Sequence, residues 1–236
     1  APMFASDNAR AASGVAEAGL VISTGISSAG TITIHPNSFI TQATLEPMKL
    51  SGLTMRSGSR FEHKANASNK EYIVNLDVSG DFVMEAGSTI NVTGKGFYDG
   101  GPGKGGCIAW VGGGYGGTGY PKESLTDYPG MCNDSNNGRT YGSITEPVDL
   151  GSGYNSFGSI SNGGGAVFLK VGGILRVNGS INANGGNGRF GSGSGGTVNI
   201  RANILEGAGA ITANGGHGDP YDSYGGGGGR IAVRVS

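Results

Sequence analysis

The feature that most constrains the fold of this chain is a segment that occurs twice, 30 residues apart. Residues 174–188 return as residues 204–218 without insertion or deletion (204 − 174 = 30 and 218 − 188 = 30). A fixed period of this length is typical of stacked structural repeats. Within each copy the apolar residues alternate with polar ones, which is the period of a strand. The repeat therefore predicts an all-β solenoid in which each copy forms one level.

Earlier parts of the chain carry the same pattern. Residues 53–61 are echoed by residues 82–90, at an offset of 29 (82 − 53 = 29). Four further segments have small or branched apolar residues at their first, third and fifth positions: 74–78, 167–171, 198–202 and 231–235. Such alternation places one face of a strand inward and the other in solvent. We expect residues at equal positions in successive levels to lie above one another.

Glycine is concentrated in one part of the sequence. The chain has 50 glycines in 236 residues, and only eight of them precede residue 94. The glycine runs lie between the predicted strands. They predict either tight corners, where a positive φ or a close backbone approach requires glycine, or extended glycine-rich loops that pack on one another.

The predicted domain organisation is one continuous solenoid. Residues 1–19 form an N-terminal cap or arm, residues 20–96 the first levels, and residues 166–236 the C-terminal levels. Between them, residues 97–165 show no clear repeat and are rich in glycine and tyrosine. This insertion is either an excursion packed by its own aromatic residues or a set of degenerate levels. Insertions in solenoids commonly lie on one face and bind ligands.

The two cysteines, Cys107 and Cys132, both fall in this insertion. An even pair in a loop-rich segment predicts a disulfide and an oxidising compartment. The chain begins at Ala1 without an initiator Met, which fits a processed secreted protein, although a piece of a longer chain would look the same. No apolar run is long enough to span a membrane. A net charge of −1 without a Lys/Arg cluster argues against nucleic-acid binding.

At the C-terminal end the motif order resembles a known family. Residues 163–236 contain, in this order, a glycine-rich loop, Val-x-Leu-x-Val, Gly-Ser-Ile-x-Ala-Asn-Gly-Gly, a second glycine-rich loop and Arg-Ile-Ala-Val. The same order is present more faintly in residues 50–106. This order resembles the glycine-rich β-helix repeats of large secreted and cell-surface proteins. The resemblance implies a right-handed parallel β-helix outside the cell with an adhesive or wall-associated role. It supplies no catalytic residues.

A second pattern is similar to the calcium-binding nonapeptide repeat. Residues 215–219 begin it, but Asp219 has the wrong spacing and the copy at residue 185 has no Asp. We therefore expect no cofactor; calcium is the one metal that the partial pattern suggests.

Stacking predicts a shared edge where the chain leaves the levels after Ile90, Ile181 and Ile211. Aromatic rings beside charged groups suit a sugar ligand, and the alternative is that these aromatics only cover the corner. The candidate binding residues are Tyr98, Asp99, Trp110, Arg189, Phe190, Asp219, Tyr221, Asp222 and Tyr224, and all of them except Trp110 are predicted at this edge.

The sequence offers little support for catalysis. Asp77 with Asp81, and Asp219 with Asp222, could each supply the two carboxylates of glycoside hydrolysis, but solvated faces explain both pairs. The three histidines are scattered along the sequence, so neither a triad nor a metal site is indicated. A polysaccharide-degrading enzyme is thus the last of three hypotheses.

Asn184 and Asn214 occupy one repeated position before a Gly-Gly turn. Amides at equal positions of adjacent levels can form a hydrogen-bonded ladder, so we expect a structural role for both.

The last predicted level, residues 230–236, is apolar and has no polar cap. Either the natural chain continues, or copies join end to end, or Arg230 and Arg234 keep the edge monomeric. The leading hypothesis is a secreted, non-enzymatic structural or adhesive protein that self-associates through its open ends. The second is a module that binds polysaccharide or cell-surface glycan.

Overall fold

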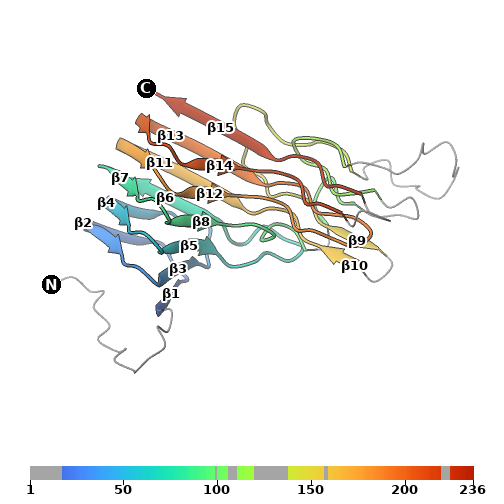
Figure 1. Ribbon diagram of the computed structural model, residues 1–236, viewed down its shortest axis with the longest axis horizontal. Coiled ribbons are helices and arrows are strands. Elements are labelled where there is room, and N and C mark those ends of the chain that lie inside the picture. Colours follow the sequence, from blue (N-terminus) through green and yellow to red (C-terminus); the bar gives the residue numbers. More distant parts are fainter. Residues whose placement is uncertain (1–17, 99, 106–110, 120–137, 157–158, 219–223) are drawn as a thin grey trace, which may run out of the picture.

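The computed structural model describes residues 18–98, 100–105, 111–119, 138–156, 159–218 and 224–236. In this part of the chain every regular element is a β-strand. Figure 1 shows the strands piled in layers, from the N-terminal ones at the bottom to the C-terminal ones at the top. The predicted all-β fold with parallel strands is confirmed.

Two parallel sheets contain nearly all the strands. The six-stranded sheet has the order β1(Ala18–Ile22), β3(Ser38–Gln42), β5(Arg60–His63), β8(Thr89–Asn91), β12(Ser180–Asn182), β14(Ala210–Thr212). The seven-stranded sheet contains β2(Ile26–Ile34), β4(Met48–Met55), β6(Val74–Val78), β7(Phe82–Met84), β11(Ala166–Val177), β13(Thr197–Glu206) and β15(Arg230–Val235). The chain alternates between the sheets, so each pass adds one strand to each sheet; in one pass the pair β6 and β7 takes the place of a single strand in the seven-stranded sheet. We call one such pass a level.

The strand register reproduces the sequence repeat. Ile181 is the partner of Ile211 in adjacent parallel strands, and Ile174 is the partner of Ile204. Leu53 pairs with Phe82 in the same way. The offsets of 30 and 29 residues are therefore the lengths of chain between adjacent levels.

The core is a set of apolar columns between the two sheets. Phe61, Ile90 and Ile181 are partners in successive strands of the six-stranded sheet, and each is fully buried. Leu76 and Leu169 form part of an equivalent column in the seven-stranded sheet. One hydrophobic cluster extends from Ile22 to Ala213. Burial of these residues is the main driving force for stacking.

The outermost strand β15 is an exception to the alternating burial. Ile231, Val233 and Val235 continue the inward columns, yet they are 46%, 42% and 57% exposed. No strand among the described residues covers them. At the other end of the stack, Leu20 and Val21 of β1 are 41% and 63% exposed.

The N-terminal cap predicted for residues 1–19 lies outside the described residues except for its last two. Those two, Ala18 and Gly19, belong to β1. Within the insertion, the structure contains an antiparallel pair that the sequence did not suggest, β9(Tyr154–Ser156) with β10(Ser159–Ser161).

Beside the two sheets, extended glycine-rich segments pack on one another. We call residues 111–117, 151–153, 163–165, 193–196 and 225–229 the glycine bundle. Backbone hydrogen bonds connect the segments: Gly164 N–H donates to Ser194 O (2.8 Å), Gly195 N–H to Gly227 O (2.9 Å) and Gly227 N–H to Gly113 O (2.8 Å).

Close approach is the reason that these positions require glycine. A Cβ atom on Gly164 would lie 2.2 Å from the carbonyl oxygen of Ala183, and one on Gly195 would lie 2.1 Å from that of Ala213. Neither residue has a positive φ. Of the two explanations that the sequence left open for the long glycine runs, packing of extended loops holds here. Positive φ is found at turns such as Gly58 and Gly87.

Candidate functional site

The segments that follow Ile90, Ile181 and Ile211 leave the stack side by side. Gly94 N–H donates to Asn184 O (3.0 Å), and Gly185 N–H donates to Asn214 O (2.8 Å). Further out, Gly188 and Gly218 form a parallel bridge. The three exits therefore share one edge at the backbone level.

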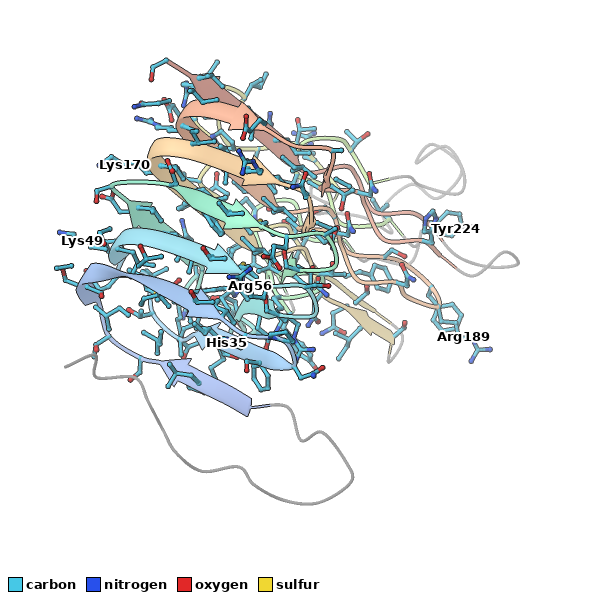
Figure 2. The ribbon with its side chains drawn as sticks, turned by 60° about the vertical axis from the view of Figure 1, so that its left-hand side comes forward. His35, Lys49, Arg56, Lys170, Arg189 and Tyr224 are labelled. Carbon is cyan, nitrogen blue, oxygen red and sulfur yellow. The ribbon has the colours of Figure 1, made fainter. Side chains whose placement is uncertain are left out.

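Among the candidate binding residues that the structure describes, Arg189 and Phe190 form a pair. The guanidinium carbon of Arg189 lies 5.1 Å from the centre of the Phe190 ring, which is within cation–π range. Arg189 is exposed and Phe190 is half-buried. Figure 2 shows Arg189 and Tyr224 on one side of the molecule and Lys49 and Lys170 on the opposite side.

The other aromatic candidates do not extend this pair into a platform. Tyr224 is 7% exposed, so its ring offers little surface to a ligand. Tyr98 is 46% exposed, but its N–H donates to Ala67 O (3.1 Å), in the turn after β5. The remaining candidates lie outside the described residues: Asp99, Trp110, Asp219, Tyr221 and Asp222. Cys107 and Cys132, the predicted disulfide, also lie outside them.

The hydroxyl of Tyr115 anchors the insertion to the stack, and that of Tyr141 bonds within the insertion. The Tyr115 hydroxyl lies 2.7 Å from Thr197 Oγ1 in β13, and the Tyr141 hydroxyl donates to Leu150 O (2.5 Å). The two rings are 4.7 Å apart. Burial raises the pKa of both hydroxyls, so neither ionises near neutral pH. They are structural donors rather than acid–base groups.

Arg230, at the start of β15, has a partner that sequence reasoning missed. Its guanidinium stacks over Tyr115 (5.3 Å) and donates to Tyr141 O (2.7 Å). The sequence suggested only that Arg230 could help to keep the sheet edge monomeric. Because Tyr115 and Tyr141 are far from Arg230 in the sequence and belong to no repeat, no local signal pointed to this contact.

Residues 143–149 lie across the outer face of the seven-stranded sheet. Arg201 and Arg234 both form ion pairs with Glu146, at 2.7 and 2.8 Å. These guanidinium groups hold the pKa of Glu146 below its usual range. Asn199 Nδ2 donates to Pro147 O (3.1 Å). The insertion thus folds back on the levels that follow it.

His63, at the end of β5, is a fully buried cross-link. Its Nδ1 lies 2.7 Å from Lys64 O, and its Nε2 accepts a hydrogen bond from Ala166 N–H (3.2 Å). Loss of hydration lowers the pKa of His63 to about 4. The neutral ring connects β5 to the first residue of β11, across the whole insertion.

Asp77 and Asp81, the two carboxylates considered for catalysis that the structure describes, have structural partners. Asp77 Oδ2 lies 3.1 Å from the Lys170 ammonium, and Asp81 Oδ1 accepts a hydrogen bond from Ile174 N–H (2.8 Å). Across the described ranges, no three His, Cys, Asp or Glu side chains gather where they could hold a metal ion.

Asn184 and Asn214 lie on adjacent levels, but the bond between them differs from an amide ladder. The side-chain oxygen of Asn184 accepts a hydrogen bond from the backbone N–H of Asn214 (2.8 Å). Two more asparagines repeat this arrangement across one period. Asn187 accepts from His217 N–H (2.8 Å), and Asn178 accepts from Ala208 N–H (3.2 Å). Each lower asparagine therefore supports the backbone of the level above.

The outer strands of the seven-stranded sheet form the clearest candidate for an interaction. β2 and β15 are its two edges, and every pairing between them is parallel. Both edges consequently have the same strand direction. Within the described residues, nothing pairs with the outer side of either strand.

Comparison of the chain with family models, with curated proteins and with solved structures finds no match. In the described part of the chain, the structure contains no helix that could cross a membrane.

Proposed function

We propose that this chain is a right-handed parallel β-helix that serves as a non-enzymatic structural or adhesive protein outside the cell, and that its copies join end to end. The observation that carries the proposal is the pair of edges, β2 and β15, which belong to one parallel sheet and have the same direction. An unpaired edge strand offers a row of backbone donors and acceptors to another chain. The β15 edge of one copy can therefore extend the β2 edge of the next.

Two general arguments support the winding and the location. Connections between parallel strands of one sheet are right-handed in nearly all proteins. The glycine-rich motifs of residues 163–236 resemble repeats of secreted and cell-surface proteins, which favours an extracellular setting.

The columns inside the stack give the joint a definite register. Val233, Ile200 and Leu169 are partners in successive strands. The same column continues through Leu76 and Met48 to Ile26 in β2. Continuation across the joint would place Val233 against Ile26 of the next copy and Val235 against Ser28. Burial of Val233 and Val235, which are now 42% and 57% exposed, would stabilise the contact.

The joint uses different surfaces on the two copies, so it need not close into a ring. Such a head-to-tail contact produces a filament when its rotation does not close. Arg234 would lie against Ser27 of the next copy, because the two residues occupy the same outward column. No like charges would meet at that position.

Sedimentation velocity and electron microscopy of the full chain over a range of concentrations test the proposal. We expect filaments or concentration-dependent oligomers from the wild type and monomers from Val233→Lys, because a charged edge residue opposes strand addition. Ile160→Lys is the matched control, since Ile160 in β10 is 40% exposed, close to the 42% of Val233, and lies outside both sheets; it should assemble like the wild type. A wild-type protein that stays monomeric at high concentration would contradict the joint.

The Arg189–Phe190 pair favours glycan binding as a second candidate function. The ring and the guanidinium could contact the CH groups and hydroxyls of a sugar. Binding on a glycan array that is lost in Phe190→Ala would support this function. Unchanged binding in Phe190→Ala would exclude this pair as the glycan site.

A further inference from the structure

A column of charged side chains runs along the outward face of the seven-stranded sheet. Lys49 pairs with Asp77 in the neighbouring strand, Asp77 with Lys170, Lys170 with Arg201, and Arg201 with Arg234. We call Lys49, Lys170, Arg201 and Arg234 the basic ladder. These residues come from four different levels, and only the register shows that they form one line. Figure 2 shows Lys49 and Lys170 on the same side of the stack.

The charges of the basic ladder are incompletely neutralised. Its four cations face two carboxylates, Asp77 and Glu146. The side chains of Lys170 and Arg201 are 70% and 56% exposed although both have acidic partners. Lys49 is exposed and forms no ion pair with a described residue. Exposed ion pairs contribute little stability, so an external anion can compete for these cations.

A hollow of about 280 Å³ adjoins the ladder at Lys49. Its polar lining residues are Lys49, Asp77 and four serines, Ser27, Ser28, Ser51 and Ser79. The hydroxyls of Ser28 and Ser79 also donate to the backbone carbonyls of Gly30 and Leu50. The ammonium suits an anionic group, whereas the carboxylate and the hydroxyls suit the hydroxyls of a sugar ring. The chemistry of the hollow therefore matches one unit of an acidic saccharide.

We propose that the basic ladder binds a linear acidic polysaccharide, with one sugar unit in the serine-lined hollow and the following units along Lys170 and the exposed side chain of Arg201. The path ends there, because residues 143–149 already bind Arg234. Neighbouring strands are about 4.8 Å apart, and a sugar unit advances an extended polysaccharide by a similar length. Lys49 and Lys170 lie two strands apart on either side of Asp77, and Arg201 follows Lys170 directly. Carboxylates two sugar units apart can therefore meet Lys49 and Lys170, and the next one can meet Arg201. This proposal rests on the proposed adhesive role and names the class of partner that the protein would bind. It does not depend on the end-to-end joint.

Nucleic acid fits the same surface less well. The net charge of the chain is −1, whereas nucleic-acid binding depends on dense phosphate neutralisation. The aromatic side chain nearest to the ladder in register, Phe168, is half-buried and has the Lys70 ammonium 5.5 Å from its ring centre. It is therefore not free to stack on a base.

Binding of polygalacturonate, measured by calorimetry at low and moderate salt, tests the proposal, with neutral dextran and duplex DNA as comparison ligands. We expect saturable binding of polygalacturonate that weakens with salt and no binding of dextran. Lys49→Ala with Lys170→Ala should weaken binding about tenfold. Asp77→Asn should strengthen it, because that variant removes a competing carboxylate. A purely structural role for the ladder predicts no such gain.

Lys104→Ala is the matched control, because Lys104 is exposed but lies outside both sheets. It should bind polygalacturonate like the wild type. Absence of polygalacturonate binding at low salt, equal weakening by Lys104→Ala, or tighter binding of duplex DNA would each overturn the proposal. Sedimentation of the same samples reports on the end-to-end joint separately, so failure of one proposal is distinguishable from failure of the other.

Discussion

Ile90 in β8 is the direct partner of Ile181 in β12, although 91 residues separate them in the sequence (181 − 90 = 91). The chain thus leaves the stack after one level, forms the insertion, and returns to build the next level in register. A long loop costs little more closure entropy than a short one. The insertion is therefore compatible with a continuous core.

The burial of the stacked isoleucines predicts that the same Ile→Ala substitution lowers stability by different amounts at different positions. Ile181→Ala removes a fully buried side chain and should lower the free energy of unfolding by about 2–5 kcal/mol. Ile204→Ala truncates the same residue type where it is 50% exposed, and should cost less than about 1 kcal/mol. Urea denaturation measures both. Equal losses would contradict the assigned burial.

The close packing of the glycine bundle predicts that some of its glycines cannot be replaced by alanine without a loss of stability. Gly164→Ala would place Cβ 2.2 Å from Ala183 O and should destabilise the protein by about 1–3 kcal/mol. Gly228→Ala is the control, because its Cβ would have no heavy atom within 4 Å. Melting temperatures of the two variants give the comparison. A Gly164→Ala protein as stable as Gly228→Ala would exclude the close packing.

The pKa of His63 predicts a loss of stability in mild acid. The folded pKa is about 4 against an ordinary value of 6.5, so between these values the unfolded chain binds more protons. The stabilisation is complete above pH 6.5 and decreases as the pH falls towards 4, in total by on the order of 3 kcal/mol.

Unfolding free energies measured from pH 4 to pH 7 test the role of His63. His63→Gln should remove this part of the pH dependence. His35→Gln should preserve it, because His35 is exposed. If the unfolding free energies of wild type and His63→Gln change with pH in parallel, the assignment of His63 as a buried neutral residue is wrong.

The asparagine bond between levels predicts an asymmetry between two equivalent residues. Asn184 contributes its side chain and Asn214 only its backbone N–H. Asn184→Ala should therefore cost about 1 kcal/mol, as expected for one hydrogen bond. Asn214→Ala should be close to neutral, because the side chain of Asn214 is exposed. Thermal unfolding of both variants tests this, and a larger loss in Asn214→Ala would reverse the assignment.

The repeat made the strands and their register predictable. The pairing of Ile181 with Ile211 follows from a 30-residue offset and an apolar period of two, both of which are local properties of the sequence. Burial in the columns was predictable for the same reason. The exposure of Val233 agrees with the sequence as well, because residues 230–236 form the last predicted level and carry no polar cap.

The insertion and the surfaces were less predictable. The contacts of Tyr115 with Thr197 and Arg230 join parts of the chain that share no repeat. The basic ladder was unpredictable for the same reason. Lys49 and Lys170 are 121 residues apart in the sequence (170 − 49 = 121), and only the strand register places them in one column. Tyr224 was a plausible binding residue by composition, but its burial depends on the packing of the glycine segments around it.

Nuclear Overhauser spectroscopy of protein labelled at the isoleucine δ1 methyl groups tests the stacked levels most directly. Partners in neighbouring strands are about 4.8 Å apart, and residues two strands apart are about 9.6 Å apart. Cross-peaks are therefore expected between Ile90 and Ile181 and between Ile181 and Ile211, but not between Ile90 and Ile211. Absence of both expected cross-peaks, once substitution of Ile181 by Val has assigned its signal, would contradict the stack.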